Sequence, residues 1–357
     1  MLYPWLIPTY NRFKLALRQG RLPSSLILAG QANLGIEELV LGMARMYLCQ
    51  HKKYEYEELV QDNCKSCLLF NNRDGSHPDI MFLTTAKNSG QDKDFADLAN
   101  TFENLQADLS DSDEEMKGNI RVESVRSLIS WIYEGSVLGN GKVAVVSKGQ
   151  CLSESSANAL LKTFEEPAAD TLMIILTEKF EDLPATLLSR AFKMEVLCQD
   201  FSQIENFLKT HLKDNYDEKR AKVALVLSRN SPLKALEYLN AGYDEDVMFF
   251  LQTLEKELFD KASFCNSLLG LLKKFTPLMQ RYILEELLLE LIKYKARVAQ
   301  SELPFLSSLD LKKLATIPSE KLFFAYQELQ SMFSYEKGLK VAAPDALLLT
   351  WLTSLRN

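Results

Sequence analysis

This sequence has no apolar run near the roughly 20 residues that a helix needs to cross a bilayer, so we expect no membrane-spanning segment. Its start contains two prolines and no cationic stretch ahead of an apolar core, so we expect no secretory signal. It has only 6 cysteines in 357 residues, too few to suggest a disulfide framework. A reducing cytoplasm is therefore the expected location.

The sequence also lacks an excess of cationic residues. It has 41 Lys and Arg against 48 Asp and Glu, and the net charge is −7. An autonomous nucleic-acid binder needs a concentrated cationic surface, which this balance disfavours. Residues 91–118 hold nine acids and two lysines and account for the whole excess. We expect an acidic insertion at about 88–118, solvated or partly disordered, with a docking tail as the alternative.

What is present is a globular composition, 47% hydrophobic and 25% charged, and a length that allows two or three domains. Short apolar runs alternate with helical patterns up to about residue 195. The predicted strands are 25–30, 79–85, 142–147, 171–177 and 191–197, and the predicted helices are 36–49, 121–134 and 154–166. Four of these strands are nearly continuously apolar, as in a sheet covered on both faces. The pattern predicts an α/β domain with a parallel sheet flanked by helices.

Beyond residue 198 the strand signal fades and helical periodicity takes over. We expect three domains, an α/β domain over 1–197, a small helical domain over 198–244 and an all-α domain over 245–357. In the segment 276–300 the apolar stripe is too wide for one face of a helix. It predicts burial on more than one side, either inside the bundle or against another subunit.

One loop has the spacing of a phosphate-binding loop. In LILAGQANLGIEEL, residues 26–39, Gly30 and Gly35 stand between a predicted strand and a predicted helix. A working loop continues with Lys, which holds the phosphates, and with Ser or Thr, which holds Mg²⁺. Here Ile36 has no charge and Glu37 would repel phosphate. We expect a degenerate loop without productive ATP binding.

A second nucleotide contact is also missing. P-loop ATPases end a neighbouring strand with an aspartate that holds Mg²⁺. The matching strand in this chain ends in Ser147 and Lys148, and neither is a carboxylate. Two independent losses predict that this domain does not hydrolyse ATP.

Residues 152–196 resemble the AAA+ clamp-loader subunits of bacterial replicative DNA polymerase. The matching positions are Asn158-Ala159-Leu160-Leu161-Lys162-Thr163 and Glu165-Glu166-Pro167 in a helix, Thr177 at the family's sensor threonine, and Ser189-Arg190-Ala191 at its Ser-Arg-Cys. The motifs YPWL at 3–6 and HPD at 77–79 narrow the resemblance to one subunit type. The resemblance covers residues 1–85 and 119–240 well, and the C-terminal region resembles the family's helical collar domain only in outline.

That subunit type keeps the AAA+ scaffold without nucleotide chemistry of its own. The resemblance implies a non-catalytic subunit, one copy in a heteropentamer, with residues 198–244 as its lid and 245–357 as its collar. Arg190, with Ser189, would act in trans as an arginine finger at the ATP site of a neighbouring gamma/tau-type subunit. A permanently charged, forked guanidinium suits that role. A delta-type subunit would open the sliding clamp, which the complex places on primer–template DNA.

Two other functions stay open at this point. Leu233 stands where the family's ATPases have a second sensor arginine, so a third nucleotide contact is missing. The alternative hypothesis from the enzyme class is an ATPase that binds nucleotide through atypical contacts. ATP titration of the isolated chain distinguishes the two. A free-standing zinc or DNA-binding module is the third reading, and salt-dependent DNA binding by the chain would be needed to support it.

The family also has a zinc module of four cysteines. Cys49, Cys64 and Cys67 map onto three of them, and Gln61 replaces the fourth. A structural zinc needs four ligands, usually Cys or His. Either His51 or Asp62 completes the set, or the metal has been lost from residues 49–67. The remaining cysteines, Cys151, Cys198 and Cys265, lie in apolar surroundings and are expected in the core, and His77 is expected to be structural.

Overall fold

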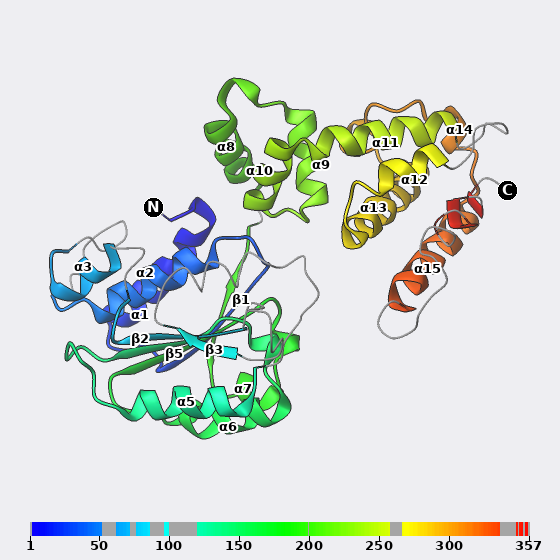
Figure 1. Cartoon of the computed structure of the whole chain (residues 1–357). Helices are drawn as coiled ribbons and strands as arrows, with labels where there is room; N and C mark the ends of the chain where they lie inside the picture. Colours follow the sequence, from blue (N-terminus) through cyan, green and yellow to red (C-terminus); the bar gives the residue numbers. More distant parts are fainter. Residues whose placement is uncertain are drawn as a thin grey trace. The chain divides into compact units, whose positions relative to one another are not determined.

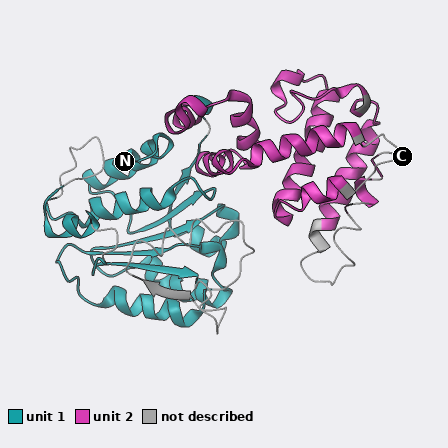
Figure 2. Ribbon diagram, turned by 45° about the horizontal axis from the view of Figure 1, so that its top comes forward, with its two compact units in different colours: residues 1–203 teal, residues 204–357 magenta. Residues whose placement is uncertain are grey.

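A computed structural model describes the chain at residues 2–51, 62–71, 76–85, 96–99, 120–198, 200–257, 266–335, 348, 350–352 and 354–355. The chain divides into two compact units, Met1–Gln203 and Ile204–Asn357, shown in Figure 2. The finer division of the helical part at residue 244 stays a prediction. Most of the expected acidic insertion, together with Gln61 and Cys265, lies outside the described residues.

Within the described residues, the first unit contains a six-stranded sheet in the order β3-β2-β4-β5-β1-β6. The strands are β1 Ser25–Gly30, β2 Ile80–Thr85, β3 Ala96–Ala99, β4 Lys142–Val146, β5 Thr171–Thr177 and β6 Phe192–Val196. Five of these strands are parallel, and β3 runs antiparallel to β2 at the edge. Every residue of β1, β4 and β5 is buried. This confirms the predicted parallel sheet covered on both faces.

The helices of the first unit form two layers. They are α1 Ile7–Arg18, α2 Ile36–Leu48, α3 Lys65–Asn71, α5 Val122–Tyr133, α6 Glu154–Glu165 and α7 Ala185–Leu188, with 3-10 turns at Pro4–Leu6, Gly149–Cys151 and Phe180–Asp182. Figure 1 shows α1 and α2 on one face of the sheet and α5 and α6 on the other. Apolar side chains of α5 and α6, including Leu128, Leu160 and Phe164, pack with Ile27 and Ile175 of the sheet. The predicted α/β class is confirmed.

One strand was not predicted. Within the acidic segment, Ala96–Ala99 pairs with β2, so that Leu98 is opposite Leu83 and Asp97 is opposite Thr84. An edge strand gains its hydrogen bonds from the backbone, so a short sequence without a strand pattern of its own can occupy it. The insertion was expected to be solvated or partly disordered, and these four residues of it form an edge strand.

The second unit is helical throughout its described residues, which confirms the predicted all-α C-terminal part. Its helices are α8 Phe201–Leu212, α9 Glu218–Leu227, α10 Pro232–Ala241, α11 Tyr243–Glu257, α12 Asn266–Leu272, α13 Pro277–Lys295, α14 Leu311–Leu314 and α15 Ser319–Tyr335, with 3-10 turns at Lys213–Asn215 and Gln300–Glu302. In α13, Leu284, Leu287, Leu288 and Leu291 are all buried. Leu289 and Ile292 of the same stripe are only half-buried, so the stripe is covered in part within the chain, and a contact with another subunit stays a prediction.

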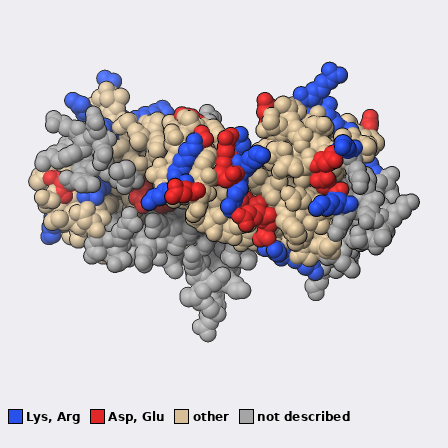
Figure 3. All heavy atoms as spheres, turned by 90° about the horizontal axis from the view of Figure 1, so that it is seen from above, with Lys and Arg blue, Asp and Glu red and all other residues tan. Residues whose placement is uncertain are grey.

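The surface of the described residues is mixed in charge. Figure 3 shows cationic and anionic side chains interspersed on one face, the usual pattern of a solvated surface. None of the helices in the described part of the chain has the length and apolar character needed to span a membrane.

Candidate functional site

The glycine loop joins β1 to α2 in the expected strand–loop–helix context. Gly35 precedes α2 with φ 74°, a left-handed conformation that favours glycine. A Cβ atom at Gly30 would lie 2.7 Å from Cδ1 of Ile36 and 3.0 Å from Cβ of Val196. Ile36 is itself only 7% exposed. The side chain at the expected lysine position therefore packs against the loop as part of the core.

A small cavity brings the degenerate positions together. Gly30, Ile36, Glu37, Ser147, Lys148 and Thr177 all line it. Burial raises the pKa of Glu37, so this carboxylate at the start of α2 is held in a setting that disfavours its charge. The Ser147 hydroxyl donates to the Leu83 carbonyl at 3.2 Å, and the Thr177 hydroxyl donates to the Lys179 carbonyl at 3.0 Å. Both hydroxyls are thus bonded to the chain's own backbone.

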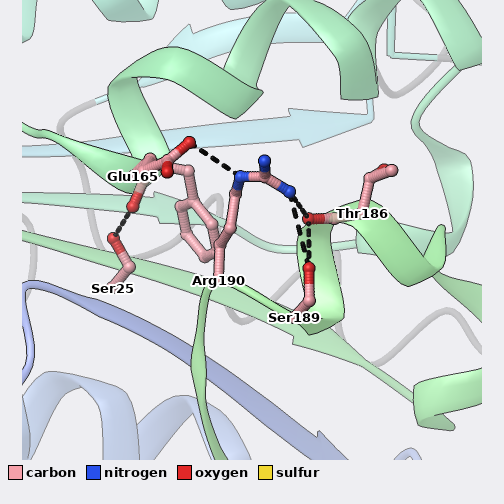
Figure 4. Close-up of polar contacts among 6 residues, drawn as sticks. Ser25, Glu165, Thr186, Ser189 and Arg190 are labelled. Atoms are coloured by element: carbon pink, nitrogen blue, oxygen red, sulfur yellow. Dashed lines mark hydrogen bonds and ion pairs between the residues drawn. The ribbon is translucent and has the colours of Figure 1, made fainter.

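The expected arginine finger lies between α7 and β6, and Figure 4 shows its contacts. The Nε of Arg190 donates to Oε2 of Glu165 at 2.8 Å. Its Nη1 donates to the carbonyl of Thr186 at 2.9 Å and to Oγ of Ser189 at 3.4 Å. Among the described residues, no hydrogen bond engages its Nη2. The side chain is 35% exposed, and the hydrogen bonds of the described residues engage its Nε and Nη1.

Glu165 is held in place by the helix it ends. The hydroxyl of Ser153 caps the start of α6 by accepting from the Ser156 amide at 3.1 Å. At the other end, the Ser25 hydroxyl donates to the Phe164 carbonyl, which joins α6 to β1. The sequence did not indicate the contact with Arg190, because 25 residues separate the partners and no periodic pattern links them.

The expected third lost contact lies in the second unit. Leu233 is the second residue of α10, which begins after the Ser231 cap. An aliphatic side chain at this position offers no hydrogen-bond donor to a phosphate.

The cysteine module forms a compact buried cluster. The ligand atoms of Cys49, Asp62, Cys64 and Cys67 all lie within 4.8 Å of one another, and all four residues are buried. Thiolates bound to zinc at about 2.3 Å in a tetrahedron lie about 3.8 Å apart, so this spacing fits a zinc ion. The structure thus brings together the three predicted cysteines and one of the two candidate fourth ligands.

His51 takes a different position from Asp62. Its Nδ1 lies 2.6 Å from Oδ2 of Asp62, so the imidazole contacts this carboxylate. Burial opposes ionisation of Cys64, but hydrogen bonds from the backbone of Cys67 and Gln50 outweigh it and lower the pKa of this thiol. Burial raises the pKa of Cys67 to about 12, so the two thiols are shifted in opposite directions, and the support for a metal site comes from the geometry of the cluster.

His77 is buried and bonded at both ring nitrogens, as a structural histidine would be. Nδ1 accepts from the Asp79 amide at 3.1 Å, and Nε2 lies 3.0 Å from the hydroxyl of Ser66. Burial lowers its pKa to about 4, which keeps the ring neutral. Of the cysteines expected in the core, Cys151 is buried, whereas Cys198 is only half-buried because it follows the last strand.

Comparison with known proteins finds a family whose model matches this chain. The model of the family described as DNA polymerase III, delta subunit, matches residues 7–199. The chain is 30% identical to the DNA polymerase III subunit delta' of Escherichia coli over 53% of this chain and 46% of that protein. It is 28% identical to the delta' subunit of Yersinia pestis over 65% of this chain and 60% of that one. The matches therefore span less than two thirds of either relative.

Among solved structures, a DNA polymerase III gamma subunit-related protein of Thermotoga maritima aligns with a TM-score of 0.46 and 16% identity. The alignment covers 97% of this chain and 98% of that one.

Proposed function

This chain belongs to the DNA polymerase III, delta subunit, family, and on that premise we propose that it is a non-catalytic clamp-loader subunit acting in DNA replication. In this proposal it occupies one position of a heteropentamer with gamma/tau-type ATPase subunits and a delta-type subunit that opens the sliding clamp. The complex loads the clamp onto primer–template DNA. ATP is bound by the neighbouring subunit and not by this chain.

The nucleotide cleft of this chain supports a non-catalytic role. Ile36 is part of the core, and Glu37 would repel a triphosphate. At the strand end that should hold Mg²⁺, Ser147 is bonded to the backbone of Leu83. A triphosphate in this cavity would therefore meet neither the ammonium nor the carboxylate that P-loop enzymes use.

The position and contacts of Arg190 are the main support for this proposal. Its guanidinium is part-exposed and held at one edge, and its Nη2 hydrogens are available to an external acceptor. An arginine supplied in trans stabilises the charge that develops on a transferring γ-phosphate and is worth about 10³–10⁵ in rate. We infer that Arg190, next to Ser189, completes the ATP site of the adjoining ATPase subunit.

The test is hydrolysis by the reconstituted complex. Arg190→Ala should leave the complex assembled and should lower the ATP hydrolysis that clamp and primed DNA stimulate. Arg126→Ala is a matched control, because Arg126 is exposed on α5 and should not change the rate. Unchanged hydrolysis in a correctly assembled Arg190→Ala complex would contradict the role in trans. Calorimetric titration of the isolated chain tests the alternative, since micromolar ATP binding would favour an ATPase with atypical contacts.

We also propose that Cys49, Asp62, Cys64 and Cys67 hold a structural zinc ion. Three thiolates and one carboxylate supply four ligands, and the compact buried cluster supports a closed site. The bound ion would join the end of α2 to the start of α3 and so stabilise this corner of the first unit.

Metal analysis of the purified chain tests this second proposal. Stoichiometric zinc is expected, and Cys67→Ser should lose it, whereas Cys151→Ser should keep it because Cys151 belongs to the core under α5 and α6. A metal-free chain with unchanged thermal stability after zinc is added back would contradict the site.

A further inference from the structure

Arg190 is held by a carboxylate whose place in the fold suggests a specific task. We propose that Glu165 is a positioning residue, which holds the guanidinium of Arg190 by its Nε edge and presents the Nη2 edge to the triphosphate of the adjoining subunit. This inference rests on the proposed function of Arg190. Figure 4 shows the two side chains converging from different elements, α6 and the turn after α7.

The contacts define the plane of the guanidinium. Glu165 accepts from Nε at 2.8 Å, and the Thr186 carbonyl accepts from Nη1 at 2.9 Å. Two acceptors on different atoms of a planar group favour one position and one orientation of that group. Without Glu165 the carbonyl contact and the longer contact to Ser189 remain, both on Nη1, and the group can rotate about that point.

The backbone that carries Glu165 is rigid, which a positioning residue requires. Phe164, the residue before it, is 1% exposed and bonded to Ser25 of β1. Pro167 stops the helix directly beyond Glu166. The carboxylate is therefore presented from the sheet's own framework, while its side chain remains 58% exposed.

The strength of the contact between Glu165 and Arg190 is suited to orienting the guanidinium, and not to holding it permanently. An ion pair between side chains this exposed is weak, so it biases the guanidinium toward one orientation and cannot hold it against a triphosphate. A strong buried pair would instead sequester Arg190. From the usual strength of exposed pairs, removing the carboxylate should lower the affected rate about two- to fivefold.

A purely electrostatic role for Glu165 would change the rate of hydrolysis in the opposite direction. If Glu165 acted mainly through its charge, it would repel the incoming triphosphate, and removing it would raise the rate. Glu165→Gln separates the two, because the amide oxygen still accepts a hydrogen bond from Nε but carries no charge. Positioning predicts that Gln restores most of what Ala removes.

The experiment uses the reconstituted complex with clamp and primed DNA. The difference in hydrolysis between wild type and Arg190→Ala defines the Arg190-dependent rate. Glu165→Ala should lower the kcat of that component about two- to fivefold with unchanged KM for ATP. Glu165→Gln should lie near wild type. Glu166→Gln, the neighbouring exposed carboxylate, is the matched control and should have no effect.

A double variant tests whether Glu165 affects ATP hydrolysis through Arg190. Because Glu165 is argued to act through Arg190, Glu165→Ala combined with Arg190→Ala should hydrolyse ATP at the rate of Arg190→Ala. Slower hydrolysis in the double variant than in Arg190→Ala would overturn the inference. Faster hydrolysis in Glu165→Ala than in wild type would overturn it as well. So would a wild-type rate in Glu165→Ala when the rate of Arg190→Ala is lowered. If Arg190→Ala itself has no effect, the proposed function fails instead, so the two failures are distinguishable.

Discussion

The indole Nε1 of Trp5 donates a 2.8 Å hydrogen bond to the carbonyl oxygen of Leu34, inside the glycine loop. Both residues are 3% exposed. This contact ties the amino-terminal segment to the loop between Gly30 and Gly35. The loop is therefore held by packing and hydrogen bonding within the chain.

Trp5→Phe should destabilise the first unit. It leaves the buried Leu34 carbonyl without its donor, which costs about 1–3 kcal/mol, and the smaller ring leaves a void that adds to the loss. Urea denaturation of wild type and variant measures the difference. A change below about 0.5 kcal/mol, the size of an ordinary surface substitution, would show that the contact does not stabilise the loop.

Arg190→Lys should behave much more like alanine than like arginine in the reconstituted complex. Lysine keeps the charge but has neither the Nε–H that contacts Glu165 nor the planar fork that faces a phosphate. We expect it to lose at least about tenfold of the Arg190-dependent hydrolysis. Retention of wild-type hydrolysis by the lysine variant would show that charge is sufficient and that orientation is not needed.

His51→Ala should weaken the proposed zinc site without removing a ligand. The imidazole lies 2.6 Å from Asp62 and orients its carboxylate, and loss of such outer partners lowers metal affinity about 10–100-fold. Competition with a chromophoric chelator measures the affinity. His211→Ala, whose ring contacts the Phe207 carbonyl in the second unit, is the matched control. Equal affinities in the two variants would exclude an orienting role for His51.

The buried carboxyl group of Glu290 predicts that the free energy of unfolding of the second unit depends on pH. Burial raises its pKa to about 7, although the Phe305 and Leu306 amides donate to the carboxylate. The nearby charges are Glu286, which raises the pKa further, and Lys293, which lowers it. The folded unit thus binds this proton more tightly than the unfolded chain does. The stabilisation is present below the unfolded pKa of about 4.5 and is lost as pH rises through about 7.

The measurement is urea denaturation of wild type and Glu290→Gln at pH 5 and at pH 8. Gln is neutral at both values and keeps an acceptor oxygen for one of the two amides. Relative to the variant, wild type should lose on the order of 2–3 kcal/mol between the two pH values. Parallel behaviour of the two proteins over this range would show that the carboxyl is ionised at both values.

Much of the first unit was predictable because its local patterns and its burial agree. The run at 171–177 is apolar throughout and becomes the fully buried β5, and the helix predicted at 154–166 ends within one residue of α6. The glycine spacing and the Ser189-Arg190 pair also mark their positions without any tertiary information. In contrast, Ala96–Ala99 has no strand pattern of its own and depends on pairing with β2.

The sequence by itself determined which residues of a working phosphate-binding loop this chain lacks, because a missing lysine or aspartate is missing in any fold. It also determined which groups remain available, the guanidinium of Arg190 and the three thiols of the cysteine module. Only the tertiary structure decided their partners. Asp62 lies in the buried cluster with the three thiols, His51 contacts Asp62, and Glu165 contacts Arg190 across 25 positions of sequence. Such pairings arise where separate helices and strands pack together, and no local pattern in the chain records them.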